Sequence, residues 1–208
     1  MNRLIRRLCT LLTAALLFGA IACTMGNRTT PLHVDTTHLR SGDLLFRMGM
    51  GAESYVVTAM SQGEYSHVGI ALLTDSGWMV LHAVPGEAEE TGGIERLKCE
   101  PIATFYGCDR AQRGATARVA CTDSMARCAA LYALRKVGEG ICFDNDYTAD
   151  DSTQFYCSEL VWRAYRHVGI DLVDDRRHSL IAGPPRDPVI YPQDILDSPH
   201  VGNLQVLY

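Results

Sequence analysis

The stretch "SHVGIALLTDSGWMVLHA", Ser66–Ala83, contains two apolar runs of strand length. The first run covers 67–73 and the second begins at residue 78. Between them stands "TDSG", Thr74–Gly77, a cluster of turn-forming residues. Two strand-like runs joined by such a cluster predict a β-hairpin.

The hairpin determines where its two histidines point. If Leu73 faces Trp78, paired positions sum to 151 and His82 lies opposite Gly69. Side chains alternate along a strand, so His67 and His82 share one face. As diagonal neighbours their backbones are ~7–8 Å apart, within reach of each other's rings. Gly69 between them is expected to leave that face open. The pair is either two ordinary histidines at a sheet surface or part of a site.

A cysteine begins the next informative segment, "QFYCSELVW", Gln154–Trp162. Cys157 is a buried small hydrophobe, half of a disulfide, or a nucleophile. The run from Cys157 to Gly169 has a helical apolar face, so the thiol is expected at a helix N-terminus. Unpaired N–H groups there, with a nearby imidazolium, lower a thiol pKa. In the nucleophile interpretation, His67 is the base and His82 orients it.

The remaining pattern predicts an α+β domain, because strands come first and helices follow. "DSMARCAALYALRKVG" predicts a helix capped by Asp123 or Ser124 and ended by Gly138. The other expected elements are strands at 43–48, 116–122 and 203–208, a helix from 52 ending near Gly63, an acidic loop at 140–154 and an irregular segment at 183–195.

The first 22 residues predict a secretory signal. A basic start with three arginines precedes an apolar run too short to span a membrane as a helix. "AIAC" before Cys23 resembles a bacterial lipobox, which implies cleavage there and lipidation of Cys23. The alternative is an ordinary signal cut nearby. Residues 23–40 are then the lipidated cysteine and a tether, and 41–208 the domain.

Charge and cysteine content limit the function classes. The formal charge of −5 becomes −8 once three arginines and no acids are removed with the signal. No basic stripe is present, so nucleic acid is not expected as a partner. Export to an oxidising compartment permits disulfides. Six cysteines remain beyond Cys23, and if Cys157 stays a thiol the other five cannot all pair.

Three segments together resemble the NlpC/P60 superfamily of papain-like cysteine hydrolases. "GDLLF" (Gly42–Phe46) is similar to the strand that leads to the base, and Ser66–Ala83 resembles the hairpin of base and orienter. "YCSELVWRAYRHVGIDL" (Tyr156–Leu172) resembles the nucleophile helix. Here the histidines precede the cysteine, which is the order of the permuted branch. "FYCSELVW" and "YPQDILDSP" (Tyr191–Pro199) are most similar to the YiiX/YaeF-like amidases.

The resemblance implies a circularly permuted papain-like fold: an antiparallel sheet or half-barrel packed against helices, with the nucleophile at a helix N-terminus. It implies that Cys157, His67 and His82 are catalytic. Glu159 stands where NlpC/P60 enzymes usually have glycine, which leaves peptidoglycan-peptide specificity open. Relatives often carry a site tyrosine in the preceding loop, and Phe143 or Tyr147 corresponds to it. Further candidates for oxyanion or near-site roles are Tyr156, Ser158, Glu159 and Tyr147.

Three function classes follow. The first is a thiol hydrolase or acyltransferase without cofactor, acting on a peptide, amide or acyl-lipid substrate at the cell envelope. The second is a non-catalytic envelope lipoprotein that uses the cleft for binding. The third is a metal site of His67, His82 and Cys157, for which no fourth ligand is evident. Acidic loops at 87–90 and 144–151 either favour a cationic substrate group or are solvated surface. Thr24 after the lipobox cysteine implies, by resemblance, sorting to the outer membrane.

Overall fold

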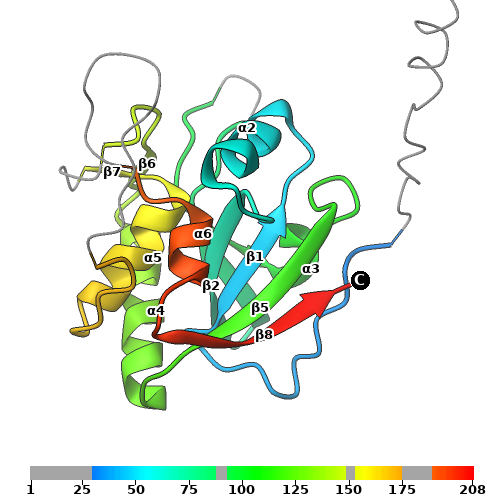
Figure 1. Ribbon diagram of the computed structural model, residues 1–208. Coiled ribbons are helices and arrows are strands. Elements are labelled where there is room, and N and C mark those ends of the chain that lie inside the picture. Colours follow the sequence, from blue (N-terminus) through cyan, green and yellow to red (C-terminus); the bar gives the residue numbers. More distant parts are fainter. Residues whose placement is uncertain (1–29, 88–92, 149–152, 175–188) are drawn as a thin grey trace, which may run out of the picture.

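The computed structural model describes residues 30–87, 93–148, 153–174 and 189–208. Its centre is a six-stranded antiparallel sheet with the strand order β4-β3-β2-β1-β5-β8 (Figure 1). The strands are β1 (Leu44–Met48), β2 (His67–Thr74), β3 (Gly77–His82), β4 (Lys98–Pro101), β5 (Arg113–Val119) and β8 (Val201–Leu207).

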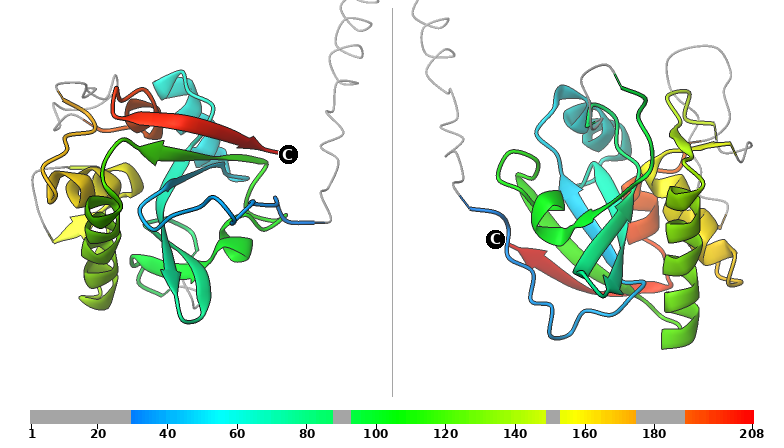
Figure 2. Two further views of the ribbon diagram at one scale, coloured as in Figure 1. Left: turned by 90° about the horizontal axis from the view of Figure 1, so that it is seen from below. Right: turned by 180° about the vertical axis from the view of Figure 1, so that it is seen from behind.

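Helices α4 and α5 lie side by side on one face of this sheet (Figures 1 and 2). A short parallel pair, β6 (Cys142–Phe143) and β7 (Gln154–Phe155), precedes α5 along the chain. The helices are α2 (Ala52–Ser61), α3 (Ile102–Phe105), α4 (Asp123–Gly138), α5 (Cys157–Arg166) and α6 (Pro192–Leu196). The sequence-predicted α+β class and the antiparallel sheet packed on helices are confirmed.

The predicted hairpin is present with the predicted register. Leu73 pairs with Trp78, and the turn lies between Thr74 and Gly77. Pairing of β2 with β3 ends at Ile70 opposite Leu81, before it reaches either histidine. The two strands therefore stop pairing at the end of the sheet where the histidines lie.

The two faces of the sheet bury different cores. Alternate residues of β1 and β2, such as Leu44 and Ile70, pack with α4 and α5 in the larger core. The intervening residues, such as Leu45 and Ala71, pack in a smaller core with α3. The odd-numbered residues of β2 face this smaller core, so His67 shares the face of Ala71.

Residues 31–34 belong to the packed domain, although the sequence places them in the tether. Leu32 and Val34 are buried in the smaller core, and the Leu32 amide donates to the Tyr106 carbonyl at 3.0 Å. Figure 2 shows this segment on the side of the sheet away from α4 and α5. The segment is polar on average, so the sequence did not indicate that its two alternating apolar side chains are buried. The predicted signal peptide and Cys23 lie outside the described residues.

Several local predictions need correction. Thr122, not Asp123 or Ser124, caps α4: its hydroxyl accepts from the Met125 amide at 3.2 Å. That helix includes Gly138 and is followed by Gly140 with a φ of +69°. The segment at 183–195 was expected to be irregular, yet it contains α6. Strand β4 and helix α3 were not predicted, and the segment at 140–154, expected to be a loop, contains β6 and begins β7.

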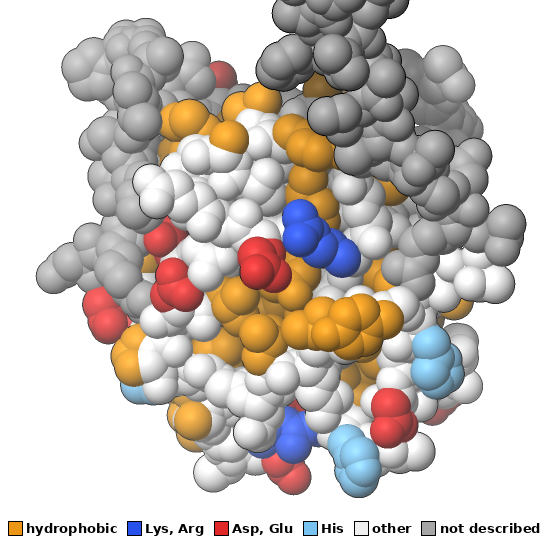
Figure 3. All heavy atoms as spheres, turned by 45° about the vertical axis from the view of Figure 1, so that its right-hand side comes forward, with side chains coloured by type: hydrophobic (Ala, Val, Ile, Leu, Met, Phe, Trp, Pro, Cys, Tyr) orange, Lys and Arg blue, Asp and Glu red, His pale blue; other side chains and the backbone are white. Residues whose placement is uncertain are grey.

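Figure 3 shows apolar side chains gathered over part of the surface toward the end of β8. β8 is an edge strand, and its Leu204 and Val206 are exposed. Within the described ranges, no helix is both long and apolar enough to cross a membrane.

Candidate active site

Cys157 is the first residue of α5, where backbone N–H groups have no partner within the helix. The Cys157 side chain is partly exposed. The backbone N–H of Val68 lies near its sulfur and lowers the pKa of the thiol, and the Ser158 hydroxyl lies 3.6 Å from the sulfur. The thiol therefore lies close to β2 at the residue that follows His67.

The end of strand pairing explains why the Val68 amide is available. The Ala71 amide donates to Asp43, so odd-numbered amides of β2 point toward the β1 side. The Val68 amide points the other way, toward β3, beyond the last paired position. The thiol near this N–H therefore lies at the end of the sheet where β2 and β3 stop pairing, which is also the end that carries the two histidines.

The two histidines are hydrogen-bonded to each other. Nε2 of His67 lies 2.9 Å from Nδ1 of His82, and the ring centroids are 5.1 Å apart. Both side chains are buried, and the Phe105 ring packs against both. The expected open face at Gly69 is not observed, because a Cβ there would lie 2.6 Å from Val80 Cγ1 and 3.1 Å from His82 Cβ. The absent side chain at Gly69 is what allows β3 to bring His82 close.

Glu100 joins this pair, and the sequence did not indicate it. Its Oε1 lies 3.1 Å from Nε2 of His82, and its Oε2 lies 3.2 Å from Arg110. Arg110 also binds Glu87 at 2.7 Å. Glu87 pairs in turn with Arg47, whose guanidinium lies 4.6 Å from the centre of the Phe105 ring. The histidine pair is therefore continued by a chain of ion pairs of alternating charge, formed by Glu100, Arg110, Glu87 and Arg47.

Burial decides the protonation of the site. It raises the pKa of the Cys157 thiol, although contacts from Ser158 and the Val68 amide lower it. The side chain is partly exposed, but dense protein on its other sides outweighs the helix start. Burial, with the nearby charge of Arg47, also lowers the pKa of His67 and of His82 well below its usual value. Both shifts favour a neutral thiol and a neutral imidazole over a thiolate and an imidazolium.

Tyr147, not Phe143, is the loop aromatic near Cys157. Phe143 is buried in the core, whereas Tyr147 is partly exposed. Burial, followed by the charge of Cys157, raises the pKa of Tyr147 to about 12, so its hydroxyl stays a donor. The Asp144 carboxylate accepts the amides of Asp146 at 2.8 Å and Thr148 at 2.6 Å, on either side of Tyr147. This loop holds Tyr147 at a φ of +55°.

The other near-site candidates have structural partners. The Tyr156 hydroxyl accepts the Ile190 amide at 3.1 Å, so it faces the core. Glu159 is fully buried and pairs with Arg163 at 2.7 Å. Burial raises the pKa of Glu159 to about 8. Of the residues adjacent to Cys157, Ser158 is the one whose side chain contacts the sulfur.

The acidic loops contain structural carboxylates. Asp144 is buried and closes its own loop, and Glu87 pairs with two arginines. Both carboxylates therefore have partners within the protein. Cysteines 99, 108, 121, 128, 142 and 157 are all free thiols.

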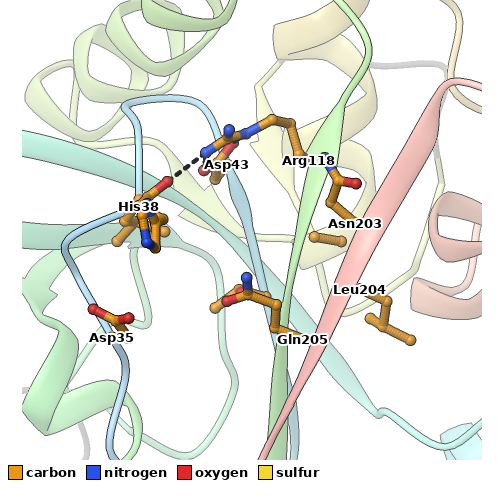
Figure 4. A pocket seen from close by; sticks show the side chains of 10 residues that line it. Asp35, His38, Asp43, Arg118, Asn203, Leu204 and Gln205 are labelled. Carbon is orange, nitrogen blue, oxygen red and sulfur yellow. Dashed lines mark hydrogen bonds and ion pairs between the residues drawn. The ribbon is translucent and has the colours of Figure 1, made fainter.

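A separate depression of about 290 Å³ lies between the segment at 35–39, β5 and β8 (Figure 4). Its charged groups already have partners: Arg118 donates to Asp43 and to the His38 carbonyl, both at 2.6 Å. None of the catalytic candidates lines it. This depression is therefore distinct from the Cys157 site.

The fold has a counterpart among solved structures. The metalloprotein yiiX from Escherichia coli O157:H7 superposes with a TM-score of 0.63 at 19% identity, covering 81% of this chain and 96% of that one. In this chain, no group of three His, Cys, Asp or Glu side chains within the described residues could hold a metal ion. The His67–His82 hydrogen bond also occupies one nitrogen of each ring. These residues do not fit a metal centre.

Sequence comparison places the chain more closely. None of the curated proteins matches it. The family model described as "Permuted papain-like amidase enzyme, YaeF/YiiX, C92 family" matches residues 38–204, which include both histidines and Cys157. The chain belongs to this family of permuted papain-like amidases.

Proposed function

We propose that this protein is a cysteine hydrolase that cleaves an amide or ester bond through Cys157, His67 and His82. The observation that carries the proposal is the closeness of the Cys157 thiol to the backbone amide of Val68, the residue after His67. Nε2 of His67 is in turn hydrogen-bonded to His82. Its membership of an amidase family supports hydrolysis as the reaction class. No cofactor takes part in the steps below.

In the first step the Cys157 sulfur attacks the substrate carbonyl carbon while its proton passes to His67. Nε2 of His67 is bound to His82, so Nδ1 is the nitrogen left to accept that proton. A neutral pair suits this route, because the proton moves during the attack instead of before it. The carbonyl oxygen becomes an oxyanion that backbone N–H groups at the start of α5 can stabilise, with the Tyr147 hydroxyl as a second donor.

In the second step the tetrahedral intermediate collapses and its leaving group takes the proton from His67. The acyl group then remains on the Cys157 sulfur as a thioester. Water attacks this thioester with His67 again as the base, which releases a carboxylic acid and restores the thiol. An amine or alcohol in place of water would make the reaction an acyl transfer.

The test is a screen of peptide amides, peptidoglycan fragments and acyl lipids, with wild type and variants compared. Cys157→Ala and His67→Ala are each expected to abolish turnover, because no thiolate or no base remains. Cys142→Ala removes another free thiol outside the site and should leave turnover unchanged. Turnover that persists in Cys157→Ala would exclude the proposed nucleophile.

Alkylation of the thiol separates a catalytic site from a binding cleft. The raised pKa predicts that iodoacetamide labels Cys157 slowly at acidic pH and faster as pH rises. His67→Ala should slow labelling near neutral pH, since the base that removes the proton is lost. A labelling rate independent of His67 would instead favour a non-catalytic protein that only binds a ligand in its cleft.

We further propose that the mature protein is anchored by lipid on Cys23 at the bacterial cell envelope, on the periplasmic face of the outer membrane. The support is the basic and apolar start of the chain and the small residues before Cys23. Cys23→Ser should abolish acylation and release the protein from membranes. An acylated, membrane-bound Cys23→Ser protein would contradict the anchor.

A further inference from the structure

Nε2 of His82 and Oε1 of Glu100 form an isolated polar contact inside the protein. The two atoms lie 3.1 Å apart, with His82 fully buried and the Glu100 side chain 12% exposed. Within the described residues, neither atom has another hydrogen-bond partner, and the angle of their own contact departs from that of an ideal hydrogen bond. At 3.1 Å the negative charge of the carboxylate oxygen favours a ring nitrogen that carries a hydrogen over one that presents a lone pair.

A carboxylate can only accept, so the proton belongs to Nε2 of His82. A neutral imidazole has one N–H, which leaves Nδ1 of His82 as an acceptor. The 2.9 Å bond between the rings then requires the N–H on Nε2 of His67. Nδ1 of His67 then carries no proton, and it is the nitrogen that can accept the proton of the Cys157 thiol.

The opposite arrangement would disable the base. If Nδ1 of His82 carried the hydrogen, Nε2 of His67 would accept it and Nδ1 of His67 would carry its own. A protonated Nδ1 cannot take a proton from the thiol. The contact of Glu100 with His82 and the hydrogen bond of His82 with His67 thus couple the tautomers of the two rings.

Neighbouring charges orient the carboxylate for this role. Arg110 contacts Oε2 of Glu100 at 3.2 Å, which leaves Oε1 for His82. Arg110 is itself fixed by Glu87 at 2.7 Å, and Arg47 binds both Glu87 and the Phe105 carbonyl. A guanidinium has no acceptor, so any residue at position 100 must present an oxygen toward Arg110.

We propose that Glu100 is a positioning residue that sets the tautomers of His82 and His67 and so leaves Nδ1 of His67 free to act as the base. Its consequence for turnover rests on the proposed function, whereas the tautomers themselves do not. Glutamine is the informative substitution. In Glu100→Gln the amide oxygen faces Arg110 and the NH₂ group faces Nε2 of His82, which then becomes an acceptor. Both tautomers are reversed.

The first measurement is ¹⁵N NMR of the histidine-labelled full chain, which reports which nitrogen of each ring carries hydrogen. Wild type should show the proton on Nε2 of both rings, and Glu100→Gln should show it on Nδ1 of both. Glu87→Gln is the matched control, because this carboxylate also contacts Arg110 but not His82. It should keep the wild-type tautomers. Wild-type protein with the proton on Nδ1 of His82 would overturn the proposal, even if no variant folds.

The second measurement is turnover on the best substrate from the screen. Glu100→Gln should lower kcat about 10²–10⁴-fold, and more than Glu100→Ala, because the reversed tautomer is worse than an unspecified one. An ion pair needed only for stability would give the reverse order, since the alanine variant loses more contacts. That order, with unchanged tautomers, would overturn the proposal. Reversed tautomers in a protein whose turnover ignores Cys157 would reject the proposed function and leave the role of Glu100 standing.

Discussion

Both faces of the central sheet bury apolar side chains, but only one of them also buries the histidine pair and Arg47. On the face covered by α4 and α5, β1 and β2 contribute residues such as Phe46 and Ile70 to an apolar core. On the other face, the same strands contribute Arg47 and His67, which are buried beside Phe105. Apolar burial stabilises in proportion to area, whereas buried ionic groups must offset their own desolvation.

The difference separates stability from chemistry within one sheet. The apolar face needs no particular pairing of polar atoms, while the other face works only when each charge and each N–H meets its partner. The gap between the ends of β2 and β3 connects them, since the Cys157 thiol approaches the Val68 amide there. Substitutions on the two faces are therefore expected to affect different observables.

The largest effects are expected on turnover, at Cys157 and His67 and then at His82. Replacing it with Gln or Asn keeps a group able to hydrogen-bond to His67 but misaligns the base. We expect kcat to fall about 10²–10⁴-fold, with measurable activity left, whereas Cys157→Ala and His67→Ala leave none. Steady-state kinetics with thermal unfolding measures both quantities. Activity retained in His67→Ala and lost in His82→Gln would mean that the two histidines have exchanged roles.

The counterpart on the apolar face is Leu160 of α5, which is fully buried. Leu160→Ala leaves a cavity and should lower the free energy of unfolding by about 2–5 kcal/mol. Below the unfolding temperature its kcat should stay near that of wild type. Leu131→Ala, at a residue 41% exposed, is the control and should cost less than about 0.5 kcal/mol. A Leu160→Ala protein that is stable but inactive would show that the apolar face also determines turnover.

Glu159 is the exception on the apolar face, and it predicts a pH dependence. Its pKa is raised from 4.5 to about 8, so the folded protein binds this proton more tightly than the unfolded chain does. The stabilisation from Glu159 is complete below about pH 4.5 and is lost as pH rises toward about 8. Glu159→Gln should remove this loss, about 3–5 kcal/mol across the window.

The measurement is chemical unfolding of wild type and Glu159→Gln at both ends of that window. Glu139→Gln provides the control, because this carboxylate is exposed at the end of α4. Parallel pH profiles for wild type and Glu159→Gln would show that the buried carboxyl does not titrate in this range.

The smallest effect is expected at Gly69, where the two strands approach closely. A Cβ there meets Val80 Cγ1 at 2.6 Å, so Gly69→Ala should cost about 1–3 kcal/mol and displace His82. Gly202→Ala is the matched control, since no atom lies within 4 Å of its Cβ position. Thermal unfolding and the His67–His82 coupling in NMR report the two effects. A Gly69→Ala protein as stable as Gly202→Ala would mean that the strands can separate without cost.

Local pattern was sufficient wherever one stretch of chain carried the whole signal. The alternation and turn of Ser66–Ala83 predicted the hairpin and its register, and the apolar period after Cys157 predicted α5. Strand β4 (Lys98–Pro101) follows the 85–93 loop, and its sequence has neither an alternating apolar pattern nor a turn cluster that would predict a strand. The contact between Glu100 and His82, which are 18 positions apart, could therefore not be predicted from local pattern.

By itself, the sequence determined the fold class, the shared face of the two histidines and the position of Cys157 at a helix start. Those features depend on neighbours along the chain, which period and turn chemistry encode. Only the tertiary structure decided that Glu100 meets His82 and that Leu32 joins the core. It also determines the burial that raises the pKa of the thiol and lowers the pKa of both imidazoles. Protonation depends on how much protein surrounds each group, and that depends on segments far apart in the chain.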